Sequence, residues 1–121
     1  MRALFDSNIL IDYLNGLAPA RAELERYEHP CISLISWIEV MVGAAPALET
    51  ETRAFLDGFE KLPVTDAVSE RAVALRRRTG LRVPDAIILA TAQAENLVLV
   101  TRNSKDFPAN APGIRIPYRV R

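Results

Sequence analysis

The run Leu97-Val98-Leu99-Val100 restricts the fold more than any other segment, because it places four apolar residues in succession. A short, uninterrupted apolar run rich in β-branched side chains is typical of a strand buried on both faces of a parallel sheet. Short apolar runs elsewhere are further strand candidates: Ala3–Phe5, Cys31–Ile35, Leu62–Val64 and Gly113–Ile116. Pro117 places the last of these at a sheet edge, because proline cannot donate to a hydrogen-bond ladder.

Segments with apolar residues at helical spacing separate these strand candidates. Strands that alternate with helices form right-handed β–α–β units, which build a parallel sheet covered by helices. The chain is therefore predicted to be an α/β protein with a central, mainly parallel sheet and helices on both faces. The expected helices run from the N-cap residues Asp6–Asn8 to Leu14, from Pro19 to about Tyr27, from Ser36 to about Val42, from Leu48 to Phe59, from Ala67 to Thr79 and from Pro84 to the turn at Asn96.

The composition indicates one soluble globular domain over residues 1–121, with half of the residues hydrophobic and a quarter charged. The formal net charge is zero and points to no partner, but thirteen of the fifteen cations are arginines, and Arg76–Arg82 contains four of them. The one cysteine, Cys31, excludes an intrachain disulfide and fits a cytoplasmic location. With neither a signal peptide nor an apolar run of about 18 residues, no membrane span is expected.

Acidic and amide side chains follow the strand candidates at the points where the chain turns. Asp6 comes directly after the first strand, Glu39 lies about one turn beyond the second, and Asn103 and Asp106 follow Leu97–Val100. Asp85 lies in the first turn of the helix that Pro84 begins. Because ligands of α/β proteins bind at the carboxyl ends of parallel strands, these side chains are predicted to converge there.

A convergence of Asp6, Glu39 and Asp85 would have a clear chemical meaning. Two carboxylates about 4 Å apart repel each other by about 4 kcal/mol at an effective dielectric constant of 20, so such a cluster takes up protons or binds a cation. Oxygen ligands without histidine or cysteine suit Mg²⁺ or Mn²⁺ better than zinc. Such ions activate water and neutralise charge during phosphodiester hydrolysis, and a nearby arginine cluster would hold the rest of a polyanion.

Each of these acids also has an ordinary structural explanation. Asp6 is a good helix N-cap, and Ser36-x-x-Glu39 has the spacing of a capping box. Asp85 suits the positive end of a helix dipole, and Asp106 suits a turn. The residues alone leave both explanations open.

Four motifs, taken in order, resemble those of PIN-domain ribonucleases, and most closely the VapC-like toxins of type II toxin–antitoxin systems. The motifs are Phe5-Asp6-Ser7-Asn8-Ile9-Leu10-Ile11-Asp12, Ser33-x-x-Ser36-x-x-Glu39, Pro84-Asp85-Ala86-Ile87-Ile88-Leu89-Ala90-Thr91-Ala92 and Leu99-Val100-Thr101-Arg102-Asn103-x-x-Asp106-Phe107. The resemblance implies a three-layer α/β/α fold and a Mg²⁺- or Mn²⁺-dependent endoribonuclease. It also implies a homodimer that is inhibited by a cognate antitoxin protein.

By position in these motifs, Asp6, Glu39 and Asp85 match the metal ligands of the family. Many relatives carry a fourth acid two residues after the threonine, where this chain has Asn103, so Asn103 and Asp106 are both candidates for that catalytic position. The resemblance further implies that Arg102, Lys105 and some residues of Arg76–Arg82 contact RNA.

The substitution of an amide for the fourth acid keeps two other functions open. One is a PIN nuclease for RNA processing, and the other is a degenerate PIN domain that binds a partner without cutting. A phosphatase-like or receiver-like domain ranks last, because Lys61 and Lys105 are the only lysines and neither fits that pattern.

Overall fold

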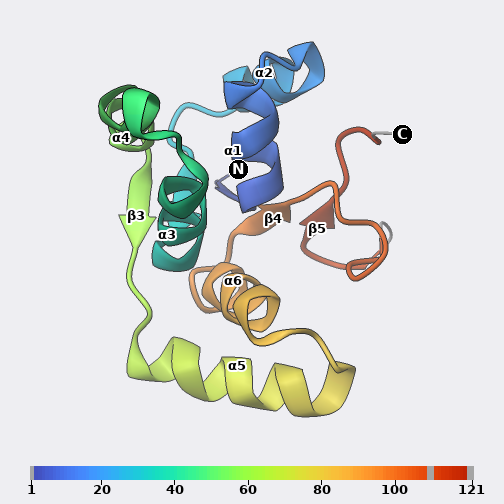
Figure 1. Cartoon of the computed structure of the whole chain (residues 1–121). Coiled ribbons are helices and arrows are strands. Elements are labelled where there is room, and N and C mark those ends of the chain that lie inside the picture. The colour runs from blue at the N-terminus through green and yellow to red at the C-terminus, as the bar shows by residue number, and fades with distance from the viewer. Residues whose placement is uncertain (1, 109–110, 120–121) are drawn as a thin grey trace.

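The computed structural model describes residues 2–108 and 111–119, so both ends of the expected domain, residues 1, 120 and 121, lie outside it. The described residues form a parallel five-stranded sheet with strand order β3-β2-β1-β4-β5 (Figure 1). This confirms the predicted sheet. The strands are β1 (Ala3–Phe5), β2 (Cys31–Ser33), β3 (Glu60–Leu62), β4 (Val98–Val100) and β5 (Ile114–Arg115).

Helices lie at the expected places, with some different boundaries. They are α1 (Ser7–Leu14), α2 (Ala18–Glu25), α3 (Leu34–Gly43), α4 (Glu49–Leu56), α5 (Asp66–Thr79) and α6 (Val83–Ala94), with a 3₁₀ turn, η1 (Pro46–Leu48), before α4. Strand β3 ends at Leu62 rather than Val64, because Pro63 has no N–H for the ladder. Thr65, rather than Asp66, caps α5, and Gly80 ends it with a φ of +77°.

Side chains that alternate along the strands face two separate hydrophobic cores. Leu4, Cys31 and Leu99 belong to the core shared with α5 and α6. Phe5 and Val100 belong to the core shared with α1, α2 and α4. Figure 1 shows the corresponding layers, with α5 and α6 on one side of the sheet and α1 and α2 on the other. The chain therefore has the three-layer α/β/α arrangement.

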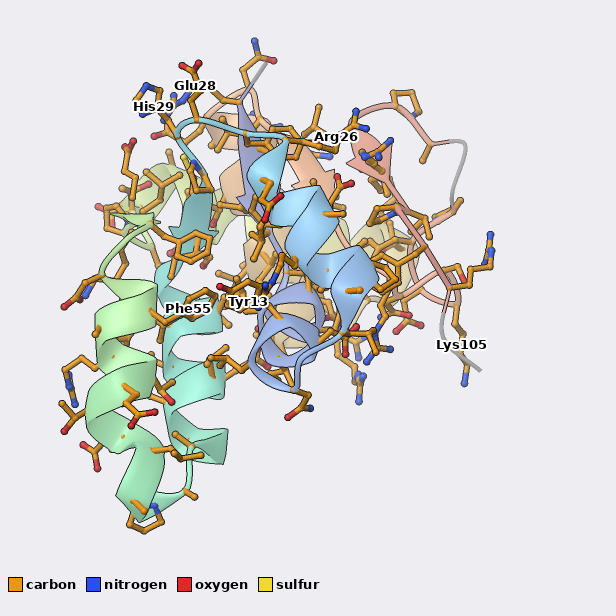
Figure 2. All side chains as sticks on the ribbon, turned by 90° about the horizontal axis from the view of Figure 1, so that it is seen from above. Tyr13, Arg26, Glu28, His29, Phe55 and Lys105 are labelled. Atoms are coloured by element: carbon orange, nitrogen blue, oxygen red, sulfur yellow. The ribbon has the colours of Figure 1, made fainter. Side chains whose placement is uncertain are left out.

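Contacts between aromatic side chains connect α1, α4 and the central strand β1 on one side of the sheet. Tyr13 of α1 and Phe55 of α4 stack with their ring centroids 4.7 Å apart, and Figure 2 shows the two rings side by side. Phe55 also contacts Phe59 edge to face, and Phe59 contacts Phe5 of the central strand in the same way. These contacts hold α4 against the layer that contains α1.

The strands β1, β2 and β4 are parallel and end at one edge of the sheet. The Asp6 N–H donates to the Val100 carbonyl oxygen (2.9 Å), which ties the end of β1 to the end of β4. The three-residue connection Glu95–Leu97 leads from α6 directly into β4, so the N-terminus of α6 lies toward the same edge. No helix in the described part of the chain is long and apolar enough to cross a membrane.

Candidate active site

Asp6 is a buried carboxylate at the carboxyl end of the central strand, with only 5% of its surface exposed. It is the N-cap of α1, as its local sequence predicts, because its Oδ1 accepts a hydrogen bond from the Ser7 N–H (2.7 Å). Its Oδ2 accepts from the Thr101 hydroxyl (2.8 Å) and from the Asn8 amide (3.4 Å). These additional donors fix the carboxylate between β1 and β4, so capping alone does not describe it.

Burial raises the pKa of Asp6 from 3.8 to about 6. Hydrogen bonds from Thr101 and Ser7 oppose this rise, whereas the negative charges of Asp85 and Glu39 add to it. The three acids singled out from the sequence are therefore close enough in the fold to interact electrostatically. Their mutual repulsion makes this edge of the sheet attractive to a cation.

Glu39 does not belong to a capping box, so that structural explanation is wrong. The cap of α3 is Ser33, whose hydroxyl accepts from the Ile35 N–H (3.1 Å), and Glu39 lies beyond the first turn of the helix. Glu39 is exposed, and its Oε1 accepts a hydrogen bond from the Ser7 hydroxyl (2.5 Å). The Glu39 side chain therefore contacts the start of α1 at Ser7, the residue that follows Asp6. The Ser36 hydroxyl is buried and has no hydrogen-bond partner among the described residues.

Asp85 is the third residue of α6, because the helix begins at Val83 and Pro84 occupies its second position. Partial burial raises the pKa of Asp85, and the charges of Asp106 and Glu39 act in the same direction. Arg82 opposes these effects from 3.9 Å, but its side chain is 81% exposed and the pair is weak. Asp85 therefore belongs to the same group of interacting carboxylates.

Asn103 and Asp106 bind each other within the loop after β4. The Asn103 amide donates to Asp106 Oδ2 (3.0 Å), and the Asp106 N–H donates to Asn103 Oδ1 (3.2 Å). The Asn103 N–H also donates to the Thr101 hydroxyl (3.1 Å), which connects this loop to Asp6. These bonds shape the loop, and the charge of Asp106 reaches Asp85.

Two residues of the site were not identified from the sequence. Ser7 connects Asp6 to Glu39 through its backbone N–H and its hydroxyl. Asp12 pairs with Arg102, which was expected to contact RNA. Asp12 lies four residues after Asn8 and hence on the same face of α1, and this spacing is the signal that could have found it.

The chemistry of the donors fits a hard divalent cation. Asp6, Glu39, Asp85 and Asp106 offer only carboxylate oxygens, the ligands that Mg²⁺ and Mn²⁺ prefer. In residues 2–108 and 111–119, no three histidine, cysteine, aspartate or glutamate side chains are yet grouped tightly enough to hold a metal ion. Glu39 is exposed and has three rotatable side-chain bonds, so it is the member of the group whose carboxylate is least restricted by burial.

Comparison with known proteins identifies the family and the fold. The family model of the PIN domain matches residues 3–111. Ribonuclease VapC10 of Mycobacterium tuberculosis (strain ATCC 25618 / H37Rv) is 34% identical over 113 residues, covering 87% of this chain and 85% of that protein. A toxin–antitoxin complex from Klebsiella pneumoniae contains a chain with 49% identity and a TM-score of 0.92, covering 98% of this chain and 99% of that one. FitAB bound to an IR36 DNA fragment shares the fold, with a TM-score of 0.82 at 19% identity and coverage of 98% and 97%.

Proposed function

The chain belongs to the PIN-domain family, and we propose that it is the ribonuclease toxin of a toxin–antitoxin module, hydrolysing phosphodiester bonds of RNA. The observation that carries this proposal is the buried Asp6 carboxylate, whose pKa is raised to about 6 and which interacts with Glu39 and Asp85 at the carboxyl edge of the sheet. Similarity to a VapC ribonuclease and to a chain of a toxin–antitoxin complex supports the same function.

We propose Asp6, Glu39 and Asp85 as the ligands of Mg²⁺ or Mn²⁺, with Asp106 in reach directly or through water. When bound, the ion supplies charge neutralisation at the scissile phosphate and lowers the pKa of water. Asp6 is the fixed member of the set, because three donors hold its two oxygens. Asn103, in place of the acid found in many relatives, orients Asp106 and Thr101.

Glu39 and Asp85, besides being proposed metal ligands, suit proton transfer. Asp85 has a raised pKa and Glu39 is exposed, so either carboxylate could accept the proton of the attacking water. In-line attack by that water would leave a 5′-phosphate and a 3′-hydroxyl. A degenerate, non-cutting domain is disfavoured, because all three acids of the family pattern are present and interact.

Exposed cations around the site suit the RNA backbone. Arg77, Arg78 and Arg82 extend from the end of α5 to the start of α6, where Asp85 lies. Lys105 is exposed on the loop after β4, and Figure 2 shows it pointing outward. Lysine and arginine side chains that neutralise phosphates release counterions, so we expect RNA affinity to fall with salt concentration.

The proposed partners are an antitoxin and a second copy of the chain. A groove with a volume of about 500 Å³ lies between α1, α3 and α4, with Leu14 41% and Leu48 51% exposed. The groove is lined by the C-terminal end of α1, whereas Asp6 caps the N-terminus of that helix. An antitoxin segment with apolar side chains in this groove would therefore have to continue along α1 to reach the site. Val73 and Val83, 47% and 57% exposed beside a small cavity between α5 and α6, are the candidate face for a homodimer. Arg77 also lines this cavity, so in a dimer it would contact RNA only from the rim of that face.

RNA cleavage by matched variants tests the proposal. The purified protein would be incubated with a structured RNA and Mg²⁺ or Mn²⁺, with and without chelator. Asp85→Asn removes a proposed ligand, whereas Asp66→Asn removes an exposed acid from the first turn of α5 and serves as the control. We expect chelator-sensitive cleavage by the wild type and by Asp66→Asn, and at least about 100-fold less by Asp85→Asn. Equal cleavage by all three proteins would contradict the proposal.

A further inference from the structure

Asp12 on α1 is a buried carboxylate outside the proposed metal site, with 7% of its surface exposed. Arg102, from the loop after β4, donates to it from Nε (2.5 Å) and Nη2 (3.1 Å). The Tyr118 hydroxyl, from the C-terminal segment, donates to Asp12 Oδ2 (2.8 Å). Three segments that are far apart in the sequence are therefore joined at this carboxylate.

Arg102 is also bound through its backbone. Its N–H donates to Asn8 Oδ1 (3.3 Å), and the Asn8 amide nitrogen donates to Thr101 Oγ1 (3.2 Å) and Asp6 Oδ2 (3.4 Å). Asn8 and Asp12 lie one turn apart on the same face of α1. The loop that begins at Thr101 is thus held against α1 by two adjacent side chains, one of which contacts Asp6.

On the basis of the function proposed above, we propose that Asp12 is a positioning residue for the active site. Its ion pair with Arg102 holds the loop from Thr101 to Phe107 in place, and thereby keeps Thr101 bonded to Asp6. Tyr118 completes this arrangement from the C-terminal segment. Arg102 then acts as a structural cation inside the protein rather than as a contact to RNA.

The exposure of the two side chains supports the structural role of Arg102. The Asp12 side chain is 10% exposed and that of Arg102 is 32% exposed. Two parallel N–H···O bonds form the strongest kind of arginine–carboxylate pair. If Arg102 turned outward to a phosphate, Asp12 would remain buried without its cation, which is strongly unfavourable.

The chain contains a matched control for Asp12. Glu23 on α2 is also buried, accepts two hydrogen bonds from Arg115 (2.7 and 2.9 Å), and accepts one from the Tyr27 hydroxyl (3.1 Å). The side chain of Arg115 does not contact the loop after β4; its carbonyl oxygen accepts from the Thr101 N–H (3.1 Å), a backbone bond that does not depend on the Glu23 carboxylate. Glu23→Gln therefore disturbs a similar buried ion pair without altering the connection to Asp6.

Amide hydrogen exchange of the full chain tests the inference without relying on cleavage. The reporters are the amides of Arg102, Asn103, Asp106 and Phe107, each of which donates a hydrogen bond in this loop. In Asp12→Asn we expect these amides to exchange about tenfold faster or more, while the amides of β4 change no more than they do in Glu23→Gln. Unchanged exchange in the loop would overturn the inference.

Cleavage kinetics and RNA binding separate positioning from direct RNA contact. Positioning predicts that Asp12→Asn lowers kcat about 10- to 100-fold, with little change in KM or in the salt dependence of RNA binding. The alternative is that Arg102, once it no longer pairs with residue 12, binds an RNA phosphate. Asp12→Asn would then bind RNA more tightly, and the slope of log affinity against log salt concentration would increase by about one. That result would overturn the inference. Glu23→Gln should keep the wild-type kcat.

A milder pair of variants covers the case in which Asp12→Asn does not fold. Tyr118→Phe removes one hydroxyl, and Tyr27→Phe is its control. Tyr118→Phe should accelerate loop exchange and lower kcat in the same direction, and Tyr27→Phe should do neither; identical behaviour of the two would overturn the inference. A wild type that cuts no RNA would refute the proposed function, whereas loop exchange would still decide the role of Asp12.

Discussion

Replacing Asp6 by Asn should stabilise the protein at neutral pH while removing its activity. Burial raises the folded-state pKa of Asp6 to about 6, against 3.8 for the ordinary carboxyl. Between these values the folded state binds more protons than the unfolded state, so the stability of the wild type falls as pH rises through this range. Asn carries no charge and removes this dependence.

The size of the effect follows from the pKa difference. A rise from 3.8 to about 6 corresponds to about 3 kcal/mol of unfolding free energy in total, of which about 2.4 kcal/mol is lost between pH 4 and pH 7. Asn cannot accept all three hydrogen bonds made by Ser7, Asn8 and Thr101, which costs about 1 kcal/mol at every pH. Asp6→Asn should therefore be about 0.5 kcal/mol less stable than the wild type at pH 4 and about 2 kcal/mol more stable at pH 7.

Urea unfolding at a series of pH values, with chelator present, measures this difference. Partial burial is the largest cause of the raised pKa of Asp85 and is common to both proteins, so it does not contribute to the difference between them. A stability difference that stays constant from pH 4 to pH 8 would refute the account of Asp6 as a buried carboxylate with a raised pKa. Added Mg²⁺ should stabilise the wild type at pH 7 more than the variant.

Three further changes have defined outcomes. Glu39→Gln should abolish RNA cleavage but change the unfolding free energy by less than about 0.5 kcal/mol, because Glu39 is exposed; urea titration and a cleavage assay decide this. Replacing both Arg77 and Arg78 by Gln should reduce the slope of log affinity against log salt by about one to two in RNA-binding titrations, and an unchanged slope would exclude them as phosphate contacts. Leu14→Asp should weaken binding of the antitoxin at least about tenfold in calorimetry, and unchanged affinity would move the antitoxin away from the groove.

The sequence predicted the order and type of the elements best where a strand is a short apolar run that the sheet buries, as in β1, β2 and β4. The outer strand β3, with Glu60 and Lys61 exposed, has no such run and was displaced in the prediction. The residues at which each element begins and ends depend on tertiary contacts and could not be predicted as well. Leu34 and Ile35 continue the apolar run of β2, yet they form the first turn of α3, because Ser33 caps the helix. Ser33 and Ser36 are both residues that commonly cap helices. The local sequence therefore could not show which of the two caps α3.

The acidic residues could be singled out from motif order, but their bonds could not. The hydrogen bond between Ser7 and Glu39 joins side chains 32 residues apart, and that between Thr101 and Asp6 joins side chains 95 residues apart. The pairing of Arg102 with Asp12 spans 90 residues and changes the meaning of an arginine that the motif alone assigned to RNA. Such contacts depend on how the sheet orders its strands, which no local pattern contains.

The most direct test of the central claim is Mn²⁺ binding followed by electron paramagnetic resonance. The claim is that Asp6, Glu39 and Asp85 form one metal site, so the wild type and the Asp66→Asn control should bind Mn²⁺ with the same affinity. Asp85→Asn should bind it about 10-fold more weakly or worse. Equal Mn²⁺ affinity in all three proteins would contradict the account, because the interacting carboxylates at the sheet edge would then not be metal ligands.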